Sequence, residues 1–130
     1  MELDRPDPIC DAETYGAHVR AFVEAFVQRE RRERWLHLLL HRPKQLTKNS
    51  SKLRSHLDRR YCIEVSDLTS LLNDQDGVFC DLGFASGPVV ITTLRALKLG
   101  DFRDAIFSMA PGTLAVYFFH EGTAFICRRK

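Results

Sequence analysis

The strongest constraint on the fold lies in the last quarter of the chain, where three strand-like runs follow one another closely. The runs are Asp104–Met109, Thr113–Phe119 and Thr123–Arg128, and the short links between them read Ala-Pro-Gly and His-Glu-Gly. Runs rich in β-branched and aromatic residues, separated by glycine-containing turns, are typical of successive hairpins. The sequence therefore predicts an antiparallel β-meander at this end.

The middle run of the meander should be buried on both faces. It reads Leu-Ala-Val-Tyr-Phe-Phe over residues 114–119, with apolar residues at every position. Successive side chains of a strand point to opposite faces of the sheet, so neither face of this strand suits water. We expect a central strand that is covered on both sides, by helices of the same chain or by the partner subunit of a homodimer.

The first half of the chain has helical patterns. Asp11 can cap a helix that starts at the next residue, and apolar residues between 15 and 27 recur at helical spacing. A second amphipathic segment, Arg31–His41, ends before Pro43. The sequence leaves open whether it continues the first helix or follows a break near Gln28. The expected fold class is α+β, with a helical N-terminal half packed on the C-terminal antiparallel β-meander.

The middle of the chain alternates loops with short elements. Residues 43–51 read as a polar loop, and Ser50 or Ser51 can cap a short helix that carries Leu53 and Leu57. Residues 61–65 and 78–82 are strand-like, and Ser66 can begin another short helix. Residues 88–99 combine a β-branched run with a leucine-rich run, and we expect a helix there.

The length of 130 residues suits a single domain, with residues 1–10 as a flexible lead. The longest apolar run is Leu114–Phe119, far short of the roughly 20 residues of a membrane-spanning helix. The acidic first residues lack the basic and apolar parts of a secretory signal. We therefore expect a cytoplasmic protein without a membrane segment.

The cysteines predict neither a metal site nor a redox motif. Cys10, Cys62, Cys80 and Cys127 are widely separated, so no pair has the close spacing of zinc or redox motifs. We expect reduced thiols that pack as small apolar side chains. No cofactor is predicted.

Three further metal-ligand candidates lie on one predicted helix. Glu33, His37 and His41 are spaced by four, which places them on the same helical face. The zinc-protease order H-E-x-x-H is absent, and this face is opposite the leucines. A solvated face is the favoured interpretation.

No catalytic residue is predicted. His120 and Glu121 fall in a tight turn, and Asp81 precedes the glycine-flanked loop Gly83–Gly87. The nucleophile-elbow, P-loop and dinucleotide-binding patterns are all missing. An enzyme of unrecognised class stays as an alternative to a non-catalytic protein.

The charge distribution is the main functional clue. Net charge is only +2, but the segment Arg29–Arg60 holds 11 Lys/Arg against three acidic residues. Such a basic segment attracts phosphates or an acidic protein surface, although it can also be a solvated face. The predicted partner is nucleic-acid backbone; the alternative is an immunity- or inhibitor-type protein that docks an acidic partner. The candidate binding residues are Arg42, Lys44, Lys48, Lys52, Arg54, Arg59 and Arg60.

Three stretches, ERRERWLHLLLHRPKQL, LRSHLDRRYCIEV and SMAPGTLAVYFFHEGTAFICRR, carry a resemblance. Together they resemble a set of short uncharacterised bacterial proteins with a basic R-x-R-aromatic-leucine stretch, an L-D-x-R-Y step and a P-G-x-L-x-aromatic ending. The resemblance spans residues 26–128 and implies a bacterial, domain-sized unit. It implies no activity.

Overall fold

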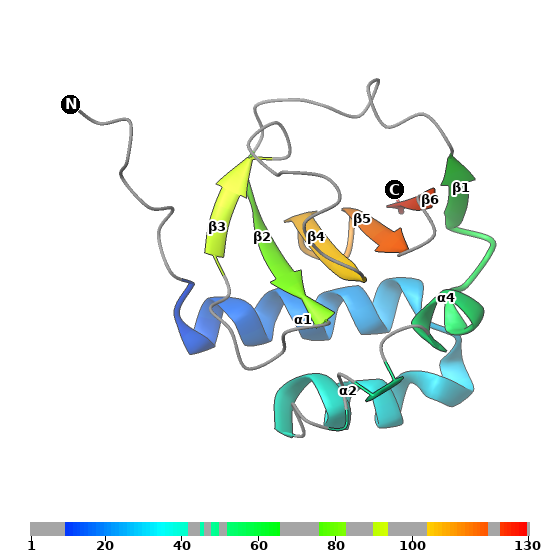
Figure 1. Ribbon diagram of the computed structural model, residues 1–130, viewed down its shortest axis with the longest axis horizontal. Coiled ribbons are helices and arrows are strands. Elements are labelled where there is room, and N and C mark those ends of the chain that lie inside the picture. The colour runs from blue at the N-terminus through cyan, green and yellow to red at the C-terminus, as the bar shows by residue number, and fades with distance from the viewer. Residues whose placement is uncertain are drawn as a thin grey trace.

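The protein is an α+β structure in which helices cover one side of a six-stranded antiparallel sheet (Figure 1). The computed structural model describes residues 10–41, 45, 48–49, 52–65, 76–82, 90–93, 104–119 and 123–129. The helices are α1 (Ala12–Phe26), the 3-10 turn η1 (Arg29–Arg31), α2 (Arg32–His41) and α4 (Leu53–His56). The strands are β1 (Cys62–Val65), β2 (Asp76–Asp81), β3 (Val90–Thr93), β4 (Ala105–Ala110), β5 (Leu114–Phe119) and β6 (Thr123–Arg128). The predicted fold class is confirmed.

The predicted meander forms the middle of the sheet. Strand order is β1-β6-β5-β4-β2-β3, so the last three strands of the chain are neighbours, with β1 added at one end and β2 and β3 at the other. Both faces of β5 are buried as predicted. Tyr117 packs in the cluster beneath the helices, and Val116 belongs to a second cluster with Phe107 and Phe118 on the opposite face.

Helix α1 begins where the sequence predicts, and it ends where the next residue makes a tertiary contact. Asp11 Oδ1 accepts a hydrogen bond from the backbone N–H of Thr14 at 2.7 Å. Val27 then leaves the helix in an extended conformation and pairs with Leu57 as an isolated antiparallel bridge. The backbone N–H of Gln28 donates to the carbonyl of His56 at 2.8 Å. The two helical segments are therefore separated by a break at Gln28.

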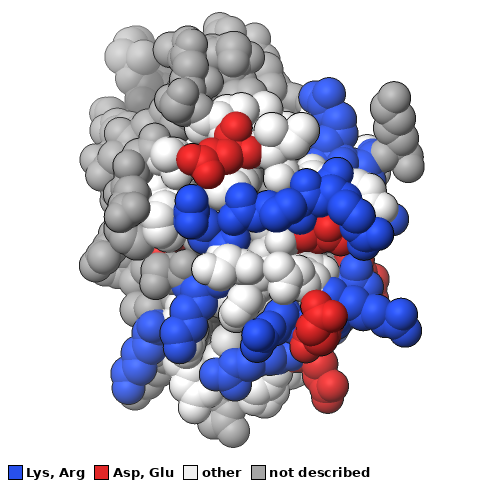
Figure 2. Space-filling view, turned by 90° about the vertical axis from the view of Figure 1, so that its right-hand side faces the viewer, with Lys and Arg blue, Asp and Glu red and all other residues white. Residues whose placement is uncertain are grey.

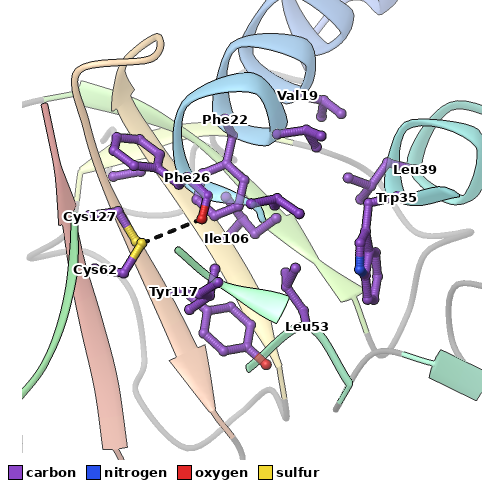
Figure 3. Packing of buried hydrophobic residues seen from close by; sticks show 14 of the residues in the cluster. Val19, Phe22, Phe26, Trp35, Leu39, Leu53, Cys62, Ile106, Tyr117 and Cys127 are labelled. Carbon is purple, nitrogen blue, oxygen red and sulfur yellow. Dashed lines mark hydrogen bonds between the residues drawn. The ribbon is translucent and has the colours of Figure 1, made fainter. Parts of the chain in front are cut away.

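The main core lies between the helices and the sheet (Figure 3). Trp35 on α2 is buried, and its indole Nε1–H donates to His56 Nδ1 at 2.9 Å, which ties α2 to α4. Cys62 and Cys127 lie side by side at the sheet side of this core, at directly opposed positions of β1 and β6. All four cysteines are buried, and none of them forms a disulfide bond.

Three expectations for the middle of the chain are corrected. The stretch 43–51, expected as a polar loop, is helical at Gln45, Lys48 and Asn49. The helix expected over residues 88–99 is wrong for Val90–Thr93, which form β3 and pair antiparallel with β2. β-branched side chains fit a pleated strand once a partner strand supplies the hydrogen bonds. The predicted strand 78–82 begins earlier, at Asp76, and includes Gly77. A Cβ on Gly77 would lie 2.7 Å from the Phe107 ring, so the missing side chain permits close strand packing.

Other expectations lie outside the described residues. These are the lead over residues 1–9, the caps Ser50 and Ser51, the helix from Ser66, and the hairpin residues His120 and Glu121. Helix α4 itself starts at Leu53, and its N-cap residue Lys52 makes no capping hydrogen bond through its side chain. No helix within the described ranges has the length and apolar character needed to cross a membrane.

Candidate functional site

Four of the predicted binding cations, Lys52, Arg54, Arg59 and Arg60, lie in or beside α4, at the end of the molecule that carries α4 and β1 (Figure 1). Figure 2 views this end, where Lys and Arg side chains form a broad band interrupted by a few acidic groups. Arg42 and Lys44 lie outside the described residues, whereas Lys48, Lys52, Arg59 and Arg60 are exposed and Arg54 is half-buried. Two of these arginines, Arg54 and Arg59, stack on aromatic rings of the sheet.

Arg54 has mainly internal partners. Its guanidinium carbon lies 5.2 Å from the ring centre of Phe119 and 5.7 Å from that of Phe125. One terminal nitrogen of Arg54 is 3.4 Å from a carboxylate oxygen of Glu64, and the Arg54 Nε is buried with no hydrogen-bond partner among the described residues. The contacts indicate that Arg54 holds α4 against the sheet.

Arg59 is held by one ring and one carbonyl group. Its guanidinium carbon lies 4.7 Å from the ring centre of Phe125, and Nη2 donates to the carbonyl of Arg54 at 3.1 Å. The residue is exposed. Stacking fixes the plane of the guanidinium, while the N–H groups that Arg54 does not occupy are available to a ligand.

Arg60 forms an ion pair with the carboxylate of Asp58. Nε and Nη2 of Arg60 donate to the two carboxylate oxygens at 3.1 and 2.8 Å, and the backbone N–H of Arg60 also donates to the carboxylate. The hydrogen bonds from Arg60 lower the pKa of Asp58, and the same pairing raises the pKa of Arg60. The carboxylate is buried, but the Arg60 side chain is 75% exposed. Its guanidinium lies 5.3 Å from the ring centre of Tyr61.

Two arginines from the other end of the chain join this group. The Arg129 guanidinium carbon lies 4.3 Å from the ring centre of Tyr61, and Nη2 donates to the Tyr61 hydroxyl at 3.3 Å. The backbone N–H of Arg128 donates to the carbonyl of Tyr61 at 3.0 Å. We call Arg59, Arg60, Tyr61, Arg128 and Arg129 the arginine–tyrosine surface.

Sequence reasoning did not include Arg128, Arg129 or Tyr61 among the binding residues. The arginine pair belongs to a segment 68 residues beyond Tyr61 and lies outside the basic stretch. The Arg-Arg sequence at the end of the last strand was the feature that could have indicated a binding role for Arg128 and Arg129. Only the pairing of β1 with β6, however, brings these two residues beside Tyr61.

A shallow hollow of about 300 Å³ opens within this surface. It is lined by Arg60, Tyr61, Ile63, Ile126 and Arg128. Ile63 is 66% exposed, and it is the large hydrophobic side chain most open to solvent among the described residues. The hollow therefore combines an apolar floor with a cationic rim.

Two other polar groups have structural explanations. His18 Nδ1 and Ser108 Oγ are hydrogen-bonded at 2.7 Å, but Ser108 is only 3% exposed, so the pair links α1 to β4 instead of presenting a nucleophile. Glu33, His37 and His41 are exposed on α2. No group of three or more potential metal ligands occurs in the part of the chain that the structure describes.

Comparisons with protein-family models, with curated proteins and with solved structures found no match to this chain. The bacterial resemblance accordingly stays a prediction.

Proposed function

We propose that this protein is a non-catalytic module that binds nucleic-acid backbone through the arginine–tyrosine surface. The observation that carries the proposal is the convergence of guanidinium groups from two distant segments on the Tyr61 ring, where Arg60 and Arg129 both lie. Phosphates are among the groups that convergent guanidinium donors bind well, because the planar fork matches two phosphate oxygens.

The ring contacts favour phosphate binding by restricting the arginines before a ligand arrives. A free arginine side chain loses rotamer freedom when it closes on a phosphate, and this loss reduces affinity. Arg59 and Arg129 already lie at 4.7 and 4.3 Å from their rings. Part of the ordering cost is therefore met in the free protein.

Charge balance also favours an anionic partner. Asp58 offsets the charge of Arg60, and Glu64 that of Arg54. Among the described residues, Arg59 and Arg128 have no acidic partner within ion-pair distance, and both are exposed. Their uncompensated charge is the part of the surface that a phosphate would neutralise.

The test compares two double variants that remove the same charge. Arg59→Gln/Arg128→Gln changes the proposed surface, and Arg20→Gln/Arg34→Gln changes exposed positions of α1 and α2. Labelled single-stranded and duplex oligonucleotides are titrated at several salt concentrations by fluorescence anisotropy, with circular dichroism to check folding. The surface variant should bind more weakly, with a slope of log affinity against log salt smaller by up to about 1.4 on single strands.

The control variant should resemble wild type. If wild type binds no oligonucleotide even at low salt, the nucleic-acid proposal fails, and the immunity- or inhibitor-type alternative is tested next with a polyglutamate probe. If both variants bind as wild type does, the arginines are a solvated face and the proposal also fails.

A further inference from the structure

We infer that the hollow beside Tyr61 receives one unpaired base, so that the preferred ligand is single-stranded nucleic acid. The inference rests on the proposed function and adds a base-binding site to the phosphate-binding arginines. It starts from a combination that phosphate binding alone does not explain: an exposed isoleucine inside a cationic rim.

The floor of the hollow comes from two opposed strand positions. Ile63 on β1 and Ile126 on β6 are register partners. Their neighbours Cys62 and Cys127 are buried in the core beneath the helices, so the two isoleucines point to the opposite face of the sheet. They form a small apolar platform beside the edge of the sheet.

The size and the rim of the hollow fit a nucleotide. A volume of about 300 Å³ is at the lower end of the range of small-ligand sites, about 300–1,000 Å³. Arg60 and Arg128 line the same hollow as the isoleucines, so a flat apolar group and its attached phosphate can be bound together. A base in a duplex remains stacked and paired, whereas an unpaired base can leave its stack and bury its apolar face against the two isoleucines.

A second copy of the chain is the competing occupant, because β1 is an edge strand of the sheet. This strand has only four residues, and its exposed Glu64 adds a charge that disfavours edge-to-edge pairing. The arginines of the rim would also face each other across a symmetric contact. Charge complementarity therefore favours an anionic ligand.

The experiment uses three labelled probes with matched backbones. The first is a single-stranded oligonucleotide, the second is the same strand with its bases replaced by abasic residues, and the third is the duplex. At equal salt, wild type should bind the complete strand several-fold more tightly than the abasic strand, since only the complete strand can bury apolar surface of a base against the two isoleucines. It should also bind the complete strand more tightly than the duplex.

Variants of the protein distinguish binding of the base from binding of the phosphates. Ile63→Ser should remove the preference for the complete strand over the abasic strand and leave the salt slope unchanged, whereas Ile63→Val should retain the preference. Arg59→Gln/Arg128→Gln should weaken the binding of all three probes and reduce the slope of log affinity against log salt. Because Ile63 is exposed, the serine variant should keep its fold, which a thermal melt checks.

The outcomes distinguish this inference from the proposed function. If no probe binds at low salt, both fail. If the complete and abasic strands bind equally, or Ile63→Ser leaves their ratio unchanged, the base site is wrong while phosphate binding stands. If the unliganded protein sediments as a dimer that Ile63→Ser converts to a monomer, the occupant is a second copy and the inference is overturned.

Discussion

Arginines that a sequence count treats alike have different environments at the α4–β1 end. Arg54 is half-buried against two rings, Arg60 is paired with Asp58, and Arg59 is exposed with its plane fixed by Phe125. Burial and partners determine which charge is available to a ligand. Arg54 is thus the member of the predicted set whose removal should affect folding most.

Replacing Arg54 by alanine should lower the free energy of unfolding by about 1–2 kcal/mol, because two ring contacts and an ion pair are lost. The matched control is Lys52→Ala, an exposed cation two residues earlier, which should change stability by less than about 0.5 kcal/mol. Urea denaturation measures both. Equal stability of the two variants would mean that the contacts of Arg54 contribute nothing.

At the scale of elements, β5 shows why burial on both faces selects a central strand. Val116 is 1% exposed and is the register partner of both Phe107 on β4 and Ile126 on β6. Tyr117, the next residue, is buried on the helix side. A strand with two apolar faces has no stable place at a solvent-exposed edge.

Val116→Asp should therefore be strongly destabilising. It introduces a carboxylate among apolar side chains, and an unpaired buried charge costs about 3–5 kcal/mol. The matched control is Thr113→Asp in the exposed turn before β5, which adds the same charge in water. Thermal denaturation of the two variants checks the expectation, and a Val116→Asp melting temperature close to that of wild type would contradict it.

At the scale of the whole molecule, two histidines join elements that are distant in the sequence. His18 joins α1 to Ser108 on β4, and His56 on α4 accepts the indole hydrogen bond of Trp35 on α2. Burial lowers the pKa of His18 below 6.5. Burial, with the charges of Arg31 and Lys52, lowers the pKa of His56 in the same way. The neutral form of both side chains is favoured in the folded protein.

Stability should accordingly fall in mild acid. The unfolded chain takes up protons near pH 6.5, whereas the folded protein takes them up only at lower pH. The unfolded state therefore binds more protons between these pKa values, and the free energy of unfolding declines as pH falls through 6.5. Urea midpoints at pH 7.5 and 5.5 should differ more for wild type than for His18→Gln/His56→Gln. An equal difference in both proteins would exclude the two histidines as the cause.

The sequence alone was sufficient for features that depend on local geometry. The cap at Asp11, the helical face of α1 and the three C-terminal strands follow from side chains within a few residues of one another. Period and turn composition carry this information, because backbone hydrogen bonds of helices and hairpins join residues that are close in the chain. The fold class followed from the same patterns.

The tertiary structure decided everything that depends on which distant segments meet. Helix α1 ends at Phe26 because the next residue, Val27, forms a bridge to Leu57, which leads into the break at Gln28. Strand β3 forms where the local sequence also favoured a helix, because β2 pairs with it. The candidate site has the same origin. Arg129 reaches Tyr61 only because β1 pairs with β6, and no local periodicity encodes that choice of partner. Strand pairing depends on long-range packing. The local sequence therefore specified the individual helices and strands, and burial of the shared core selected which of them are neighbours.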